Sequence, residues 1–411
     1  MVKVSIVGDM MCEPLLLNAS KHDREFDFSP VFSNVRELFS QSDFVIGNLE
    51  TPIAGEKAGY VNRLFSFNAP KEFAMAAKEA GISLVSTANN HCMDRGFDGL
   101  LETVKNLDEI GLEHIGTCAF PEKNERVHYQ TIDGQTIAVI AYTYGTNYLD
   151  HHRALTPEQE KHINLLRPYF ESVYMKRTEK RTLADRVINK VLRCFDPEKR
   201  TQIKKALGMK YNSPRKDDAV NLETAAPYLE QFKEDIRNAK ENANIVIVLP
   251  HVGGQFNLEP GAFTELVIQA AREAGADAII ASHPHIVQKA EMKNGIPCFY
   301  SIGNFSMSPN SVYLLHENLP EYGVVVNLYI ENKKIVQTTF SVLKIIEPRG
   351  KTLTVYPVDQ LAAKTVSEGE LAQLRVDVAQ IYSVVTGDEA SADIEIQREY
   401  LLAEIPGGIH C

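Results

Sequence analysis

The sequence predicts an α/β fold with a layered sheet, and two observations carry that prediction. Short apolar runs such as residues 2–7 and 245–249 are rich in valine and isoleucine, as buried strands are. Longer segments between such runs show helical spacing: residues 97–111 place Leu100 and Val104 on one apolar face and end at a glycine. Strands that alternate with helices in this way build a buried sheet that helices cover.

The remaining elements follow the same alternation along the chain. Short apolar runs bounded by turn residues predict further strands at residues 43–47, 82–88, 115, 136–142, 276–281, 297–301 and 322–330. Apolar residues that recur every three or four positions predict further helices at residues 30–42, 70–81, 225–242 and 261–275. Near the C-terminus, a β-hairpin is expected over residues 333–346 and a long helical stretch within residues 367–404.

Two segments interrupt the alternation and divide the chain. Residues 151–216 hold 17 Lys and Arg against seven Asp and Glu, a net charge of +10, and are helix-like, with expected helices at residues 183–194 and 197–207. We therefore expect one domain from residues 1–150 and 217–346, a basic helical insertion at 151–216, and a C-terminal extension with a helix at 347–411. The few aromatic residues of the insertion, including Tyr174, are expected to pack the insertion itself.

The charge of the insertion has two interpretations. It either docks a polyanionic substrate, an anionic lipid or a nucleic acid, or it forms a solvated helical face that contacts the acidic remainder of the protein. The whole chain of 411 residues has a formal net charge of −11, which argues against general nucleic-acid binding by its surface.

Composition also bears on the compartment. The six cysteines lack the paired spacing of zinc sites and of small disulfide frameworks, so reduced thiols are expected. No run of about 18 apolar residues predicts a membrane span, and the first residues lack the features of a signal peptide. The sequence therefore predicts a cytoplasmic protein and leaves its oligomeric state open.

Five polar motifs stand where predicted strands end. They read GDMM at 8–11, GNLET at 47–51, NNHCMD at 89–94, HVGG at 251–254 and SHPHIV at 282–287. Loops beyond the carboxyl ends of strands are where α/β folds build their sites. The motifs combine carboxylates, an asparagine oxygen and histidines, the mixed donor set that a pair of metal ions of borderline hardness requires.

The first three motifs suggest definite roles. Asp9 and Glu50 supply carboxylates that can bind or bridge two cations. In NNHCMD, an asparagine oxygen can bind a metal while His91 acts as a general acid, and Asp94 can orient its imidazole. Two metal ions about 3.5–4 Å apart would activate a bridging hydroxide and stabilise the leaving oxygen of an ester or amide.

The last two motifs bring histidines to the same edge. His283 and His285 flank a proline, and in an extended segment their side chains would point the same way, toward one metal cluster. His251 precedes Gly253 and Gly254, which let the backbone come close to a ligand.

Taken one at a time, the same residues have purely structural interpretations. Asp9 can cap a turn, Glu50 can be a solvated loop carboxylate, and residues 89–90 can form a simple turn. His91 can be a hydrogen-bonded structural histidine, and residues 300–305 can be a strand followed by a turn. The metal-site hypothesis depends on their joint placement at strand ends.

The ordered motif set resembles the bacterial capsule-synthesis CapA family, also called the poly-γ-glutamate synthesis family. The residues that carry the resemblance are GD, GNLE-T, ANNHxxD-G, HxG, HPH-[IV] and YSxGNF, between residues 2 and 305. That family is similar to the calcineurin-like metallophosphoesterases, so the resemblance implies their four-layered α/β sandwich, with His91 as the acid and residues 300–305 as a cleft wall. The metal ligands that the resemblance implies are Asp9, Glu50, Asn90, His251, His283 and His285.

The implied function is metal-dependent hydrolysis with two divalent ions, Mn, Fe or Zn. The expected substrate is a small-molecule or polyanionic phosphoester or γ-glutamyl-type amide. The alternative is a non-catalytic protein that binds or handles poly-γ-glutamate or capsule polymer and holds a structural metal. The chain also departs from the phosphoesterases, because Met11 replaces their usual histidine and Glu50 replaces an aspartate. One metal is therefore expected to be under-coordinated, weakly held or absent.

Overall fold

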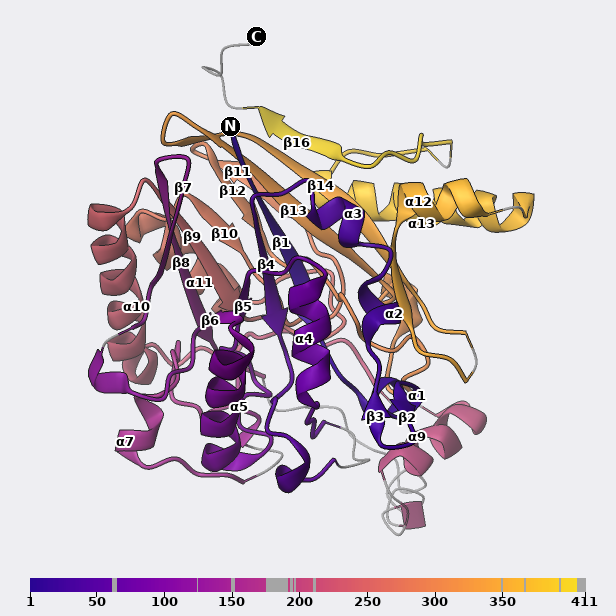
Figure 1. Cartoon of the computed structure of the whole chain (residues 1–411), viewed down its shortest axis with the longest axis horizontal. Coiled ribbons are helices and arrows are strands. Elements are labelled where there is room, and N and C mark those ends of the chain that lie inside the picture. The colour runs from indigo at the N-terminus through magenta and orange to yellow at the C-terminus, as the bar shows by residue number, and fades with distance from the viewer. Residues whose placement is uncertain are drawn as a thin grey trace.

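Two β-sheets lie face to face between two layers of helices (Figure 1). The computed structural model describes residues 1–60, 65–123, 125–148, 152–174, 191–192, 195, 197–209, 212–348, 350–365, 367–391 and 393–404. Apolar side chains of both sheets form one shared core between them, and each outer face has its own core with the helices. This arrangement confirms the predicted layered α/β class.

The first sheet has strand order β15-β14-β13-β1-β4-β5-β6, with β16 paired to β14. Its central strand β1 is buried along its whole length, pairing in parallel with β4 and antiparallel with β13. That position explains why residues 2–7 are apolar without alternation. The strands are β1 (Val2–Met10), β4 (Phe44–Leu49), β5 (Leu84–Ser86), β6 (Glu113–Ile115), β13 (Tyr322–Glu331), β14 (Lys334–Ile346), β15 (Thr354–Pro357) and β16 (Tyr400–Glu404).

The second sheet has strand order β11-β12-β10-β9-β8-β7. Its centre, β8-β9-β10-β12, is parallel, while β7 and β11 pair antiparallel at the two edges. The strands are β7 (His128–Ile132), β8 (Gln135–Thr143), β9 (Ile245–His251), β10 (Ala278–Ile280), β11 (Ala290–Lys293) and β12 (Ile296–Phe299). A separate two-stranded sheet joins β2 (Lys21–His22) to β3 (Glu25–Phe26).

Helices cover the outer faces of both sheets. The first sheet is covered by α1 (Pro14–Ala19), α2 (Ser29–Phe32), α3 (Arg36–Phe39), α4 (Lys71–Glu79) and α5 (Gly96–Ile110). The second is covered by α10 (Leu222–Asn242) and α11 (Ala262–Ala274). The remaining helices of the described ranges are α7 (Pro157–Glu160), α9 (Pro197–Ala206), α12 (Val358–Lys364) and α13 (Glu368–Thr386), with 3-10 turns at Glu56–Ala58, Pro121–Lys123 and His316–Asn318.

The structure corrects two sequence-based predictions. The helix expected at residues 30–42 is two short helices, α2 and α3, because Val35 N–H donates to the Phe32 carbonyl three residues back instead of four. The hairpin expected within residues 333–346 is instead the single strand β14, which pairs with β13 before it. Asn332 and Lys333 have φ values of +50° and +66° in the two-residue turn between them, the geometry that suits a tight hairpin.

The C-terminal extension belongs to the core. In α13, Leu374, Val378 and Ile381 join the apolar core between the two sheets, and Asp377 accepts a hydrogen bond from the Tyr322 hydroxyl at 2.5 Å. The helix α13 therefore covers an edge of the sandwich, on the side opposite α10 in the view of Figure 1. Along the described ranges, no helix is both long and apolar enough to cross a membrane.

The insertion is described in part. Its expected helix at residues 197–207 is α9, whereas most of the helix expected at 183–194 lies outside the described residues. Residues Ile163 and Leu165 are buried and form isolated bridges with Thr117 and Thr143, so this stretch packs against the sheets. The proposed division into domains stays a prediction.

Candidate metal centre

A bulge at the end of β1 aims Asp9 into the centre of the molecule. The pairing of β1 with β4 shifts register between Val7 and Asp9, and the extra residue is Gly8. A Cβ at Gly8 would lie 2.1 Å from the Gly303 carbonyl oxygen, which accepts a hydrogen bond from Asp9 N–H at 3.1 Å. Only glycine permits this approach, so the GD motif encodes the direction of the Asp9 side chain.

Glu50 lies at the middle of the cluster of predicted ligands. It is 0% exposed, and neither of its carboxylate oxygens accepts a hydrogen bond from a described residue. Histidine nitrogens surround Oε1 instead: His251 Nε2 at 3.4 Å, His285 Nε2 at 3.8 Å and His91 Nε2 at 3.9 Å. A buried carboxylate without hydrogen-bond donors is costly unless a cation completes its surroundings.

Four donor atoms converge on one point beside Glu50. The Nε2 atom of His251 lies 2.7 Å from Asn90 Oδ1, 3.2 Å from His283 Nδ1 and 3.4 Å from Glu50 Oε1. On the other side of the His251 ring, Nδ1 lies 3.0 Å from the Ser282 hydroxyl and 3.2 Å from Asn48 Nδ2, both of which can donate to it. Because Asn90 Oδ1 can only accept, the 2.7 Å contact is made by an Nε2–H of His251, and that proton would have to leave before Nε2 could bind a metal.

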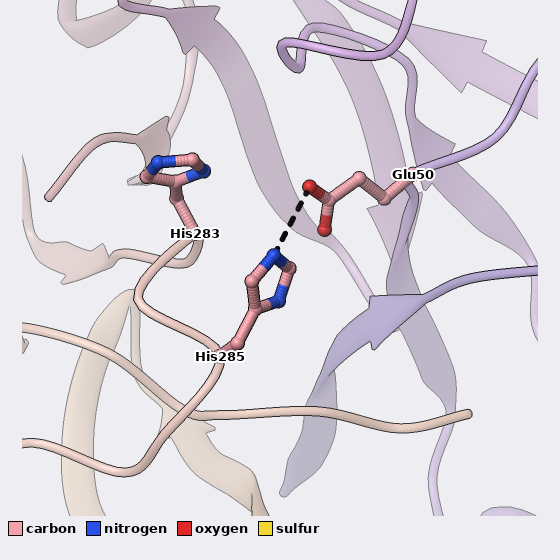
Figure 2. A group of neighbouring side chains, drawn as sticks. All are labelled: Glu50, His283 and His285. Atoms are coloured by element: carbon pink, nitrogen blue, oxygen red, sulfur yellow. Dashed lines mark ion pairs between the residues drawn. The ribbon is translucent and has the colours of Figure 1, made fainter. Parts of the chain in front are cut away.

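A second group of donors lies on the Asp9 side. His285 Nδ1 is 3.3 Å from Asp9 Oδ2 and 2.9 Å from Asn304 Oδ1. Two sets of three side chains could each hold a metal, Asp9 with Glu50 and His251, and Glu50 with His283 and His285. Glu50 is common to both sets, and Figure 2 shows its carboxylate directed at the His285 ring, with His283 nearby.

His91 and Asp94 form a hydrogen-bonded pair at the rim of the cluster. His91 Nδ1 lies 2.7 Å from Asp94 Oδ2, which also accepts the Phe67 backbone N–H at 2.6 Å. The Phe67 ring packs on the His91 ring with centroids 4.4 Å apart. Asp94 is thus fixed as the acceptor for Nδ1–H, and His91 Nε2 faces Glu50.

The backbone of the SHPHIV motif differs from the one expected. His283 has φ +110° and His285 has φ +58°, so the segment is bent, and the prediction of an extended segment was wrong. The two rings nevertheless lie 5.8 Å apart beside Glu50. Positive φ at non-glycine residues is strained and concentrates at functional sites, which agrees with the position of these histidines.

The two histidines have opposite electrostatic environments. Burial and the neighbouring His251 and His285 lower the pKa of His283 well below its ordinary value, so its imidazole is neutral. Burial also disfavours charge on His285, but Glu50 and Asp9 outweigh it and raise its pKa to about 9. For Asp9, burial opposes ionisation, yet the hydrogen bond and charge of His285 together with His251 lower its pKa.

The structure brings all eight predicted site residues together, and their roles as ligands or acid stay predictions. It adds residues that the sequence analysis did not single out. Asn48 donates to Asp9 Oδ1 at 2.7 Å, and Asn304 donates through Nδ2 to the His285 carbonyl at 2.9 Å. Both belong to motifs named in the sequence analysis, GNLET and YSxGNF, so their place in these motifs could have predicted that they lie at the site.

Two tyrosines also lie beside the cluster, and no sequence motif indicated their position. The Tyr144 ring lies 4.7 Å from the His283 ring, and the Tyr174 hydroxyl lies 3.2 Å from His283 Nε2. Tyr174, which the sequence analysis assigned to packing of the insertion, thus also contacts the metal cluster. Met11, at the place of the phosphoesterase histidine, is buried in an apolar cluster with Phe67 and Phe256.

Comparison with known proteins agrees with the motif-based resemblance. The sequence profile of the family described as bacterial capsule synthesis protein PGA_cap matches residues 3–308. The chain belongs to this family. The PGA_cap match contains every predicted site residue and ends before β13.

Two curated relatives carry matching names. The chain is 24% identical over 306 residues to the PGA biosynthesis protein CapA of Bacillus subtilis (strain 168), covering 74% of this chain and 63% of that protein. It is 25% identical over 310 residues to the capsule biosynthesis protein CapA of Bacillus anthracis, covering 74% and 59%. The chain thus spans about six tenths of the length of these PGA_cap relatives.

A solved structure of a hypothetical protein from Thermus thermophilus is also similar. It covers 87% of this chain and 98% of its own, with 13% identity and a TM-score of 0.36.

Proposed function

We propose that this PGA_cap protein is a metal-dependent hydrolase with a two-metal site. The observation that carries the proposal is Glu50, a fully buried carboxylate that lacks hydrogen-bond donors among the described residues and is common to both donor sets. The donor set of carboxylate, amide oxygen and imidazole fits Mn, Fe or Zn. When bound, a metal pair supplies an activated water and charge stabilisation for attack on a phosphoester or γ-glutamyl-type amide.

The residues divide into two groups around Glu50. Asn90, His251 and His283 would hold one metal ion, because their donor atoms converge near His251 Nε2. Asp9 and His285 would hold the other, and the proton that His285 carries would leave as a metal binds there. Glu50, which is common to both donor sets, would contribute to holding both ions.

His91 would act as the general acid. Asp94 accepts from Nδ1 and so fixes the orientation of the ring, which leaves Nε2 at the rim of the cluster to pass a proton to a leaving group. The Phe67 ring, packed against His91, limits rotation of the imidazole.

Elemental analysis of wild type beside a His283→Ala/His285→Ala variant tests the metal assignment. About two equivalents of Mn, Fe or Zn in wild type, lost in the variant, support the dinuclear site. His316→Ala is the matched control, since this histidine is exposed and outside the cluster. No metal in wild type after reconstitution would overturn the proposal.

The acid assignment needs a separate variant. His91→Ala should retain both metal ions and lose turnover of phosphodiester or γ-glutamyl amide probes, because His91 is assigned as a proton donor and not as a ligand. Unchanged turnover in His91→Ala would refute that role.

Burial of Met11 in apolar surroundings favours a second candidate function. With a thioether in place of a histidine, the Asp9 side has one donor fewer, which is compatible with a single structural metal. The protein would then bind poly-γ-glutamate or a capsule polymer without cleaving it. About one equivalent of metal, with binding of γ-linked polyglutamate and no release of product, would favour this function.

A further inference from the structure

A short stretch inside the insertion and the stretch that spans its C-terminal boundary meet beside the metal cluster and are hydrogen-bonded to each other. We call residues 171–174 and 212–220 the insertion base. Ala219 N–H donates to the Val173 carbonyl at 3.0 Å, and Arg167 donates to the carbonyls of Ala219 and Ser172 at 3.2 and 3.1 Å. The Arg167 guanidinium also lies 5.2 Å from the ring centre of Phe263 in α11. The insertion base is therefore fixed to the core.

A buried carboxylate anchors the second segment of the insertion base, residues 212–220. Asp217 accepts from Gly261 N–H through Oδ1 and from Thr264 N–H through Oδ2, both at 2.9 Å, at the beginning of α11. A Cβ at Gly261 would lie 2.2 Å from Asp217 Oδ1, so glycine is needed at that position. The position of residue 217 relative to the core is thus set by packing and by hydrogen bonds.

The HVGG motif accommodates the neighbouring residue, Arg215. A Cβ at Gly254 would lie 1.9 Å from the Arg215 carbonyl oxygen, and Arg215 N–H donates to the Gln255 carbonyl at 3.0 Å. The second glycine of this motif therefore makes room for the insertion base, while His251 of the same motif belongs to the metal cluster. The HVGG motif therefore contacts both the insertion base and the metal cluster.

Arg215 is a cation held at the edge of the cluster. Its guanidinium carbon lies 5.0 Å from the ring centre of Tyr174, whose hydroxyl is 3.2 Å from His283 Nε2. Arg215 is exposed, and within the described ranges no carboxylate forms an ion pair with it. Stacking on an aromatic ring orients a guanidinium while its N–H donors stay available to bind an anion.

We propose that Arg215 binds an anionic group of the substrate, a phosphate or a carboxylate, next to the group held at the metal cluster. This inference rests on the proposed function, because it assumes a substrate at the cluster. The protein has a net charge of −11, and Asp9 and Glu50 lie in the cluster itself, so a cation beside the cluster offsets their repulsion of an anionic substrate. Arginine also recognises phosphate and carboxylate in two-point geometry.

Binding measurements by calorimetry on the metal-loaded protein test the inference with three probes. Inorganic phosphate reports on the cluster alone, pyrophosphate adds a second phosphate, and γ-glutamylglutamate adds carboxylates beside an amide. Arg215→Ala should weaken pyrophosphate, γ-glutamylglutamate or both by at least about tenfold, the loss expected for one charged hydrogen bond, and leave phosphate unchanged. A loss for pyrophosphate alone identifies a phosphate-bearing substrate, and a loss for γ-glutamylglutamate alone identifies a carboxylate-bearing one.

The adjacent Lys216→Ala variant is the matched control. Lys216 is also exposed and loses the same charge, so its affinities should stay within about twofold of wild type. Arg215→Lys should recover only part of the affinity, because an ammonium keeps the charge and loses the planar fork. Unchanged affinity for both larger probes in Arg215→Ala, an equal loss in Lys216→Ala, or no binding of either probe to wild type would overturn the inference.

Hydrolysis is scored separately in the same samples. A protein that binds the larger probes through Arg215 and cleaves none of the phosphodiester and γ-glutamyl amide probes would refute the proposed hydrolase and support the anion site. Cleavage that continues unchanged in Arg215→Ala, with unchanged affinities, would refute the anion site and support the hydrolase.

Discussion

Replacing Glu50 with glutamine separates two effects of this residue on stability: its contribution to metal binding and the cost of burying its carboxylate. With metal bound, Glu50→Gln removes the one carboxylate that is common to both donor sets. A ligand present at 100 times its Kd stabilises the folded state by about 2.7 kcal/mol per site, so two bound ions contribute about 5 kcal/mol in wild type. The variant should lose most of that stabilisation.

Without metal, the substitution is expected to leave the stability of the protein unchanged or to raise it. Both Glu50 oxygens lack hydrogen-bond donors among the described residues, and a buried unsatisfied polar group costs about 1–3 kcal/mol, more if charged. A neutral amide lowers that cost, and His285, whose pKa Glu50 raises, can then lose its proton. Metal-free Glu50→Gln should therefore unfold at a urea concentration no lower than metal-free wild type.

The assay is urea unfolding of wild type and variant, each with Mn²⁺ and each with a chelator. We expect a large chelator-dependent shift of the midpoint in wild type and little or none in Glu50→Gln. Glu56→Gln, an exposed glutamate in the following loop, should behave as wild type. Tight binding of two Mn²⁺ ions by Glu50→Gln, or a metal-free variant much less stable than metal-free wild type, would refute the reasoning.

Three further predictions concern other parts of the molecule. Asp217→Ala should lower the free energy of unfolding by about 2–4 kcal/mol in urea titrations, because it leaves the N–H groups of Gly261 and Thr264 without their acceptor; an unchanged midpoint would contradict this. Burial raises the pKa of Glu13 above its ordinary 4.5, although Tyr313 donates to it, so its contribution to stability is greatest below about pH 4.5 and is lost as pH rises through the raised pKa. The stability advantage of wild type over Glu13→Gln should accordingly shrink with rising pH, and a constant difference in unfolding midpoints would be evidence against it. Reversing charge at Lys204 and Lys205 of α9 should weaken binding of polyanions if the insertion docks them, and unchanged affinity for γ-linked polyglutamate would leave the solvated-face interpretation.

Much of the site could be predicted because each motif follows a strand. The carboxyl ends of β1, β4 and β5 lie side by side through parallel pairing, so residues at or just beyond those ends lie close together. The same holds for β9 and β10 in the second sheet. The apolar pattern of each strand, together with the parallel pairing of neighbouring strands, was sufficient to predict where Asp9, Glu50 and His251 lie.

The contacts that could not be predicted depend on tertiary packing. Nothing local places Tyr174 near His283, since the two are 109 residues apart and one lies in the insertion. The bent backbone at His283 and His285 is likewise imposed from outside, because neither residue favours positive φ. The break between α2 and α3 shows the same limit, since apolar spacing indicates the buried face but not the continuity of the helix.

The antiparallel pairing of β1 with β13 has a consequence for the order of folding. Val2 pairs with Ile330, and Asp9 forms a bridge with Asn304, so the central strand acquires one neighbour only after some 300 further residues have left the ribosome. Contacts of such separation form slowly, because closing a long loop precedes any gain from pairing. Until then one side of β1 is an unpaired, apolar edge, which is the condition that favours association with other chains. Metal capture at Asp9 and His285 would consequently report completion of nearly the whole PGA_cap fold, and a pulse-labelled nascent chain should acquire metal late.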